Sequence, residues 1–137
     1  MSRIGKLDGI KDREIVLFTI TVETSFLASH QLTFKNGTQE DAHEHNWAVK
    51  VAVCSEKLNE DGLVMDFCVL KEMIQAIVTK FEGKKLENMD CFSGKNASAE
   101  IVAKYIFETI KPQLSSSVKM GYVEVAEAAG CRAKYGD

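Results

Sequence analysis

Residues 15–28, IVLFTITVETSFLA, and the run WAVKVAVCSEKL after Asn46 decide the fold class of this 137-residue chain. The first stretch is rich in β-branched and aromatic residues, which favour strands. In the second, three valines share one face and Lys50 lies on the other, as expected for a strand. Between them, KNGTQED (35–41) is a polar loop with an Asn-Gly turn signal. The two stretches therefore predict neighbouring antiparallel strands.

Helical patterns follow the second strand. Asp66 stands just before apolar residues at helical spacing and is a good N-cap, because its carboxylate can accept from free N–H groups of the first turn. This helix is expected to end near Gly83. A second helix is expected from Ser98, another cap, to the neighbourhood of Pro112, with residues 81–96 as a connecting loop.

The C-terminal part predicts a hairpin. Residues 118–127, VKMGYVEVAE, and 131–135, CRAKY, form two strand patterns around a turn at 128–130. The expected order is therefore strand, strand, helix, helix, strand, strand. This order indicates an α+β protein, with a four-stranded antiparallel sheet and two helices on one face.

Composition fits one domain over residues 1–137, with residues 1–13 as a loose N-terminal arm. The net charge is −3 and no basic block stands out, so we expect no nucleic-acid partner. No apolar run reaches membrane-spanning length, and the start MSRIGKLDGIKDRE does not resemble a signal peptide. The four cysteines lack a CxxC spacing, which favours free thiols in a cytoplasmic protein.

The chemistry centres on the chain's only three histidines, His30, His43 and His45. Residues two apart on a strand point to the same face, so His43 and His45 can share an ion. His30 ends the preceding strand and can meet them across the pair. Three imidazoles suit Zn²⁺ and leave a fourth position open, as in catalytic zinc sites. The alternative is that these are ordinary surface or capping histidines.

Four motifs in order carry a resemblance to a known family: FLASHQL (26–32), HEHNW (43–47), GLVMDFCVLK (62–71) and YVEVAEAAGCRAKY (122–135). They resemble the 6-pyruvoyl-tetrahydropterin synthase and 6-carboxytetrahydropterin synthase family over residues 16–135. The resemblance implies a T-fold of ββααββ order. It also implies a barrel-like homo-oligomer, trimeric or hexameric, with active sites between subunits.

The resemblance also implies a site. It assigns one zinc ion to His30, His43 and His45, the set that strand geometry indicates. It assigns the anchoring of a small pterin-like substrate to Glu127, whose carboxylate can pair with two adjacent N–H groups. It places Ser98 near the pterin, although a helix cap is the simpler role for this serine. The alternative to the anchoring role is that Glu127 is a solvated charge at a strand end.

The chain departs from the family at its proton-transfer residues. Gln39 stands where the family has a catalytic cysteine, and glutamine cannot act as a thiolate. Glu40, beside it, matches relatives that carry E-x-x-H-G-H and cleave the dihydroneopterin side chain, which makes it a candidate general base. The alternative is that Glu40 is an ordinary solvated charge in an acidic loop. Glu82 and Gly83 replace the family's Asp-His pair, so only the Glu82 carboxylate is left as a second catalytic candidate.

Three functions follow from these residues. The first is a zinc-dependent lyase that acts on the side chain of dihydroneopterin or its triphosphate, by cleavage or by elimination. The second is a non-catalytic or altered-specificity pterin-binding protein that kept the metal and the anchor. The third is a purely structural zinc at a subunit interface, which the open fourth position disfavours.

Overall fold

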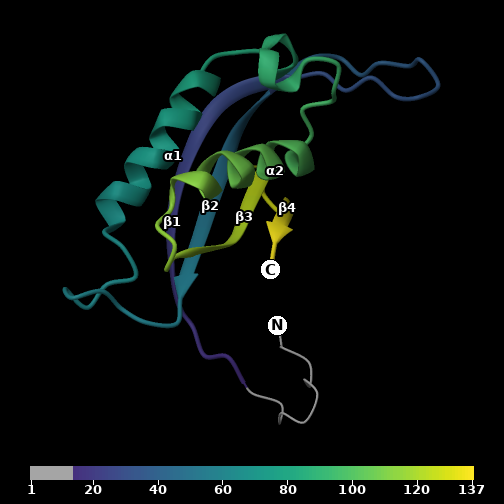
Figure 1. Cartoon of the computed structure of the whole chain (residues 1–137). Coiled ribbons are helices and arrows are strands. Elements are labelled where there is room, and N and C mark those ends of the chain that lie inside the picture. Colours follow the sequence, from purple (N-terminus) through teal and green to yellow (C-terminus); the bar gives the residue numbers. More distant parts are fainter. Residues whose placement is uncertain (1–13) are drawn as a thin grey trace.

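The computed structural model describes residues 14–137 and shows a four-stranded sheet with two helices on the same face (Figure 1). The expected 1–13 arm lies outside the described residues. The elements occur in the predicted order: β1 (Phe18–His30), β2 (His43–Ser55), α1 (Phe67–Phe81), α2 (Ala99–Ile110), β3 (Lys119–Ala128) and β4 (Cys131–Gly136). The strands are all antiparallel in the spatial order β1-β2-β3-β4. The α+β prediction is confirmed.

Both predicted caps are present. The Asp66 carboxylate accepts from the N–H of Cys68 at 2.7 Å, and the Ser98 hydroxyl accepts from the N–H of Ile101 at 3.2 Å. Such caps satisfy backbone donors that the first helical turn leaves free, and each contributes about 1 kcal/mol. The first helix ends at Phe81, and Gly83 follows with a φ of +71°. This left-handed conformation is one that glycine adopts without steric cost.

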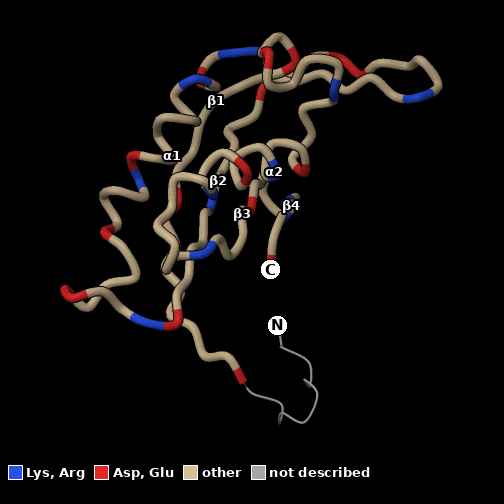
Figure 2. Tube along the Cα trace, viewed as in Figure 1, with Lys and Arg blue, Asp and Glu red and all other residues tan. Residues whose placement is uncertain are grey.

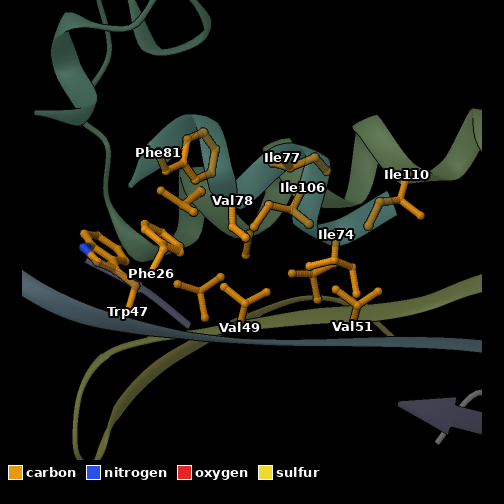
Figure 3. Close-up of a cluster of buried hydrophobic side chains, with 14 of the residues drawn as sticks. Phe26, Trp47, Val49, Val51, Ile74, Ile77, Val78, Phe81, Ile106 and Ile110 are labelled. Atoms are coloured by element: carbon orange, nitrogen blue, oxygen red, sulfur yellow. The ribbon is translucent and has the colours of Figure 1, made fainter. Parts of the chain in front are cut away.

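The core lies between the sheet and the two helices (Figure 3). Period-2 residues of β2 face period-3.6 residues of the helices, so each element buries one side. The fully buried side chains include Phe26, Trp47, Val51, Leu70, Ile74, Val102, Ile106 and Ile110. None of the helices within residues 14–137 combines the length and apolar character needed to cross a membrane.

Two predictions of element bounds need correction. β1 begins at Phe18 rather than at residue 15, and β2 begins at His43 rather than near Asn46. The expected loop 81–96 holds two short 3₁₀ helices, Leu86–Asn88 and Asp90–Phe92. Leu86 and Phe92 are buried there, and this tertiary packing orders a segment whose local pattern is neither helix nor strand.

The segment after α1 also covers part of the free edge of β1. The N–H of Gly83 donates to the Leu27 carbonyl at 2.7 Å, and the N–H of Ser29 donates to the Lys84 carbonyl at 2.9 Å. An uncovered strand edge carries unpaired N–H and C=O groups. The covering segment satisfies these groups at the end of β1 that leads to His30.

Candidate metal centre

The three histidines meet at one end of the sheet because of the β1–β2 register. His30 is the last residue of β1 and lies directly opposite His43, the first residue of β2. Directly paired residues on antiparallel strands have side chains on the same face. His45 follows two residues later on that face, while Glu44 between them is exposed and is expected to point away. The predicted convergence therefore occurs on the face that carries the helices.

The imidazoles are close enough to share one ion. One nitrogen from each of the three rings lies within 4.8 Å of the other two. The Nε2 atoms of His30 and His43 are 3.0 Å apart. Three nitrogens at the usual Zn–N distance of about 2.0–2.1 Å in a tetrahedral site would lie roughly 3.3 Å apart. The spacing therefore fits a small divalent ion with only slight adjustment.

Hydrogen bonds behind two of the rings fix which nitrogen faces the ion. Nδ1 of His30 lies 2.8 Å from the Ala97 carbonyl, and Nδ1 of His43 lies 2.9 Å from the Asp41 carbonyl. A carbonyl oxygen only accepts, so both Nδ1 atoms carry the proton in the neutral rings. Both Nε2 atoms then present lone pairs toward one another, as in metal-ligating histidines held by a carbonyl partner.

Two buried atoms at the centre have no hydrogen-bond partner: Nε2 of His45 and Oε2 of Glu127. Buried polar atoms are nearly always paired in native proteins, so an unpaired set calls for an ion, a water or a ligand. Burial lowers the pKa of His45, and the nearby His43 and His30 act in the same direction against Glu127. His45 is therefore held in the neutral form, which is the form that binds metal. The donor set fits a zinc ion.

Trp47 forms one wall of this centre. Its ring centroid lies 4.9 Å from that of His30 and 5.8 Å from that of His45, and its Nε1–H donates to the Ala28 carbonyl at 3.0 Å. The ring is completely buried. A buried aromatic wall restricts water and holds the imidazoles in place. Because Trp47 is the only tryptophan, its fluorescence reports on the site alone.

Glu127 reaches the centre from β3. Its Oε2 lies 3.2 Å from Nε2 of His30 and 3.7 Å from Nε2 of His45. Glu127 follows the buried Val125 by two residues on β3, and this alternation places it on the face that carries the helices. The β3–β4 register shifts between Ala126 and Ala128, so Glu127 has no partner on β4. The predicted anchor residue and the histidines are therefore brought together.

Glu40 lies behind His43. Its Oε1 is 3.8 Å from Nδ1 of His43 and accepts from the N–H of Leu32 at 3.2 Å. It is thus on the Nδ1 side of the ring, whereas the cluster gathers at Nε2. Glu40 belongs to the margin of the site, held at the base of the 31–42 loop.

Glu82 and Ser98 occupy other positions. The Glu82 carboxylate accepts from the N–H of Leu27 at 3.2 Å, and Leu27 lies three residues, roughly 10 Å of strand, before His30. The structure therefore does not bring Glu82 to the histidines within this chain. Ser98 uses its hydroxyl as the α2 cap, but it directly follows Ala97, whose carbonyl holds His30. Both substrate and catalytic roles remain predictions for these two residues.

Sequence reasoning missed the residues that support the histidines from behind. The carbonyls of Asp41 and Ala97 carry no side-chain signal, and Glu87 stands in a stretch predicted as a plain loop. The four cysteines are all free and lie outside the histidine cluster. Burial raises the pKa of Cys54 and of Cys91, which keeps both as unreactive thiols.

The fold and the site define a class: an α+β protein of ββααββ order with a three-histidine centre suited to a metal ion and a carboxylate on its wall. Residues 19–137 match the model of the family described as 6-pyruvoyl tetrahydropterin synthase. The chain belongs to this family.

Two curated relatives and one solved structure show how it is related. The chain is 32% identical over 127 residues to a 6-carboxy-5,6,7,8-tetrahydropterin synthase of Synechocystis sp., covering 87% of this chain and 93% of the relative. It is 30% identical over 102 residues to a dihydroneopterin monophosphate aldolase of Pyrococcus furiosus, covering 74% and 82%. The Caenorhabditis elegans 6-pyruvoyl tetrahydropterin synthase structure superposes with a TM-score of 0.77 at 22% identity, covering 90% and 97%. The T-fold expected from the sequence is confirmed.

Proposed function

We propose that this protein is a zinc-dependent, pterin-processing lyase that cleaves the side chain of dihydroneopterin or of one of its phosphates. The observation that carries the proposal is the convergence of His30, His43 and His45 with the Glu127 carboxylate at one end of the sheet. The likeness to an aldolase of phosphorylated dihydroneopterin supports cleavage over elimination. So does Gln39, which replaces the thiol of the family's usual chemistry.

Glu127 is proposed to hold the pterin ring. A pterin presents adjacent N–H groups along its guanidine-like edge, and a carboxylate can accept from both in a bidentate pair. Oε2 of Glu127 is buried without a partner, so this atom has an unused acceptor for such a donor. The ring would then lie against the histidine centre, with its side chain near the ligands. Ser98 stays a proposed secondary contact at the start of α2.

Glu40 is proposed to act as the general base. Bound zinc would supply a Lewis acid that polarises a substrate oxygen. Glu40 would accept the proton of the hydroxyl on the second side-chain carbon, and that carbon would leave as an aldehyde when its bond to the first side-chain carbon breaks. The electron pair of this bond would pass into the neighbouring C=N bond of the pterin, and the retained carbon would then take up a proton to give the hydroxymethyl product. A positioned base contributes typically about 10²–10⁴-fold. Its Oε1 is now shared with the N–H of Leu32, and a rotation of the side chain would turn it toward substrate. Glu82 is kept as a second candidate only for a site completed by another subunit.

A second candidate function is a pterin-binding protein with altered or lost turnover. The observation that favours it concerns Glu82 and Gly83, which stand where the family has an Asp-His pair. Gly83 offers no proton relay, and the Glu82 carboxylate is engaged with the β1 edge. In such a protein, the metal and Glu127 would bind the pterin without catalysing a reaction.

We further propose that the protein works as a homo-oligomer, trimeric or hexameric, in the cytoplasm. β1 and β4 are the two edges of the sheet, and strand edges pair readily with other strands. The described cysteines are free thiols, as expected in a reducing compartment. Lys and Arg positions are interspersed with Asp and Glu positions along residues 14–137 (Figure 2), which fits a small-molecule substrate rather than nucleic acid.

The deciding experiment incubates the zinc-loaded protein with dihydroneopterin, its monophosphate and its triphosphate, and identifies the products by mass. We expect 6-hydroxymethyl-dihydropterin. Glu40→Gln should lower kcat by about 10²–10⁴-fold while zinc content and pterin affinity are kept. Asp41→Asn is the matched control, because it removes a neighbouring charge and retains the carbonyl that holds His43; it should keep full activity.

Other outcomes separate the alternatives. Release of triphosphate without carbon–carbon cleavage would refute the aldolase assignment. Binding of all three compounds without any product would support the pterin-binding candidate. Glu127→Gln should weaken pterin binding in either case, and unchanged binding in this variant would remove the anchor from the proposal. Loss of assembly in His43→Ala, with pterin affinity unchanged, would point to a structural metal.

A further inference from the structure

A ring of interactions closes behind His30. Nδ1 of His30 donates to the Ala97 carbonyl at 2.8 Å. The N–H of Ala97 donates to Oε2 of Glu87 at 2.9 Å, and the N–H of Gln31 donates to Oε1 of the same carboxylate at 3.0 Å. Gln31 is bonded to His30, so the ring returns to its start. One side chain therefore holds both the backbone of the ligand and the carbonyl that orients its imidazole.

We propose that Glu87 is a positioning residue that presets His30 for the metal by bridging the N–H groups of Gln31 and Ala97. The inference rests on the metal site of the proposed function but not on the reaction catalysed there. A carboxylate that accepts two backbone N–H groups forms charge-assisted hydrogen bonds, which are about twice as strong as neutral ones. Partners behind metal-ligating histidines fix the ring orientation and thereby the affinity for the ion.

The surrounding chain holds Glu87 in place. It lies in the 3₁₀ helix Leu86–Asn88, and the preceding Leu86 is completely buried. The position of the Glu87 backbone is thus set by core packing. The two segments that its carboxylate joins also meet nearby, where the N–H of Thr33 donates to the side-chain oxygen of Asn96 at 2.8 Å and the Asn96 side-chain amide donates to the Thr33 carbonyl at 3.1 Å. These bonds keep the segments together, and the Glu87 carboxylate adds the alignment of the Gln31 and Ala97 N–H groups. Without the carboxylate, we expect the Ala97 carbonyl to shift relative to Nδ1 of His30.

Glu82 provides a matched comparison within the same chain. Alternate N–H groups along the β1 edge are satisfied by the covering segment: Leu27 by the Glu82 carboxylate, Ser29 by the Lys84 carbonyl and Gln31 by the Glu87 carboxylate. Glu82 and Glu87 therefore perform the same task on the strand edge. Only Glu87 also reaches the residue that holds His30, so only Glu87 should affect the metal.

The test measures zinc affinity by competition with a chromophoric chelator and by Trp47 fluorescence, on the unaltered full chain and on three variants. We expect Glu87→Ala to weaken zinc binding by about 10–100-fold, as is usual for partners behind a ligand. Glu87→Gln keeps the size and one acceptor oxygen, so its loss should be smaller. Glu82→Ala should leave zinc affinity unchanged, because its contact on the edge does not reach His30.

Cobalt provides a readout that a general loss of stability would not change. The visible spectrum of Co²⁺ reports the number and geometry of its ligands, and Glu87→Ala should alter it in protein that is folded by circular dichroism. If Glu87→Ala does not fold, Glu87→Gln is measured in its place, and full zinc affinity in folded Glu87→Gln would then overturn the proposal.

The outcomes separate this inference from the proposed function. Zinc affinity in Glu87→Ala equal to that of the unaltered protein would overturn the inference alone. An equal loss in Glu82→Ala and Glu87→Ala would also overturn it, because the effect would then belong to the strand edge. Failure of the unaltered protein to bind zinc would overturn both the inference and the zinc-dependent function.

Discussion

Zinc should stabilise the folded protein, because the structure gathers one ring nitrogen from each of three imidazoles at a single point. Nε2 of His30 and Nε2 of His43 stand 3.0 Å apart, while both Nδ1 protons are committed to carbonyls. Nε2 of His45 is buried without a partner. Unfolding separates these groups, so an ion bound by all three favours the folded state alone. Removal of zinc with a chelator is therefore the perturbation.

The size of the effect follows from mass action. Free zinc at 100 times its dissociation constant adds about 2.7 kcal/mol to the free energy of unfolding. For a chain of this length, about 1 kcal/mol shifts Tm by roughly 3–5 °C. Zinc should therefore raise Tm by about 8–14 °C. Thermal melts followed by circular dichroism, with and without the chelator, measure this shift.

The shift should shrink in acid. Zinc binds neutral imidazoles, so protons compete with it as the pH falls. Burial lowers the pKa of His45, so the unfolded chain takes up this proton first. Without zinc, His45 therefore costs folded stability as the pH falls below the ordinary histidine pKa of about 6.5. A Tm difference measured at pH 7.5 should be clearly smaller at pH 5.5.

Variants show whether the shift comes from the histidines. His43→Ala should abolish it, because only His30 and His45 then remain and the chain has no fourth histidine to replace the lost nitrogen. Cys68→Ser and Cys131→Ser are the controls, because these exposed thiols are the other strong zinc ligands within reach of solvent; both variants should keep the full shift. A zinc-induced shift that survives in His43→Ala and disappears in a cysteine variant would refute the assignment of the metal centre.

Two further predictions concern the ends of elements. Ser98→Ala should lower the free energy of unfolding in urea titrations by about 1 kcal/mol through loss of the α2 cap. As a secondary contact it should also weaken pterin affinity, and an unchanged affinity would leave Ser98 as a helix cap alone. Gly136→Ala should destabilise the β3–β4 pair by about 1–3 kcal/mol, because its φ is +119° and a Cβ would come within 2.4 Å of the Gly121 carbonyl oxygen. Gly94→Ala, also at positive φ but in open space, should cost less, and an equal cost would show that the close contact is unimportant.

Local signals explain the parts of the fold that were predictable. Asp66 and Ser98 cap their helices as expected, since a cap acts on N–H groups two or three residues away. The bounds of β1 and β2 were less accurate, because strand ends are set by pairing with the neighbour rather than by composition. The sequence between α1 and α2 has no helical or strand pattern, and its two 3₁₀ helices depend on the burial of Leu86 and Phe92.

The candidate site also combines features that local sequence predicts with features that depend on tertiary packing. The convergence of His30, His43 and His45 was predictable from the sequence, because two strand ends and a two-residue period place these side chains on one face. The surroundings of the histidines came from tertiary packing alone: Glu40 lies behind His43, and Glu82 lies on the strand edge. The same packing lets Glu87 join Gln31 to Ala97. Periodicity places residues within one element or one strand pair. Contacts between residues about 10 or 56 positions apart arise only when helices and loops pack on the sheet, and no local pattern encodes that distance.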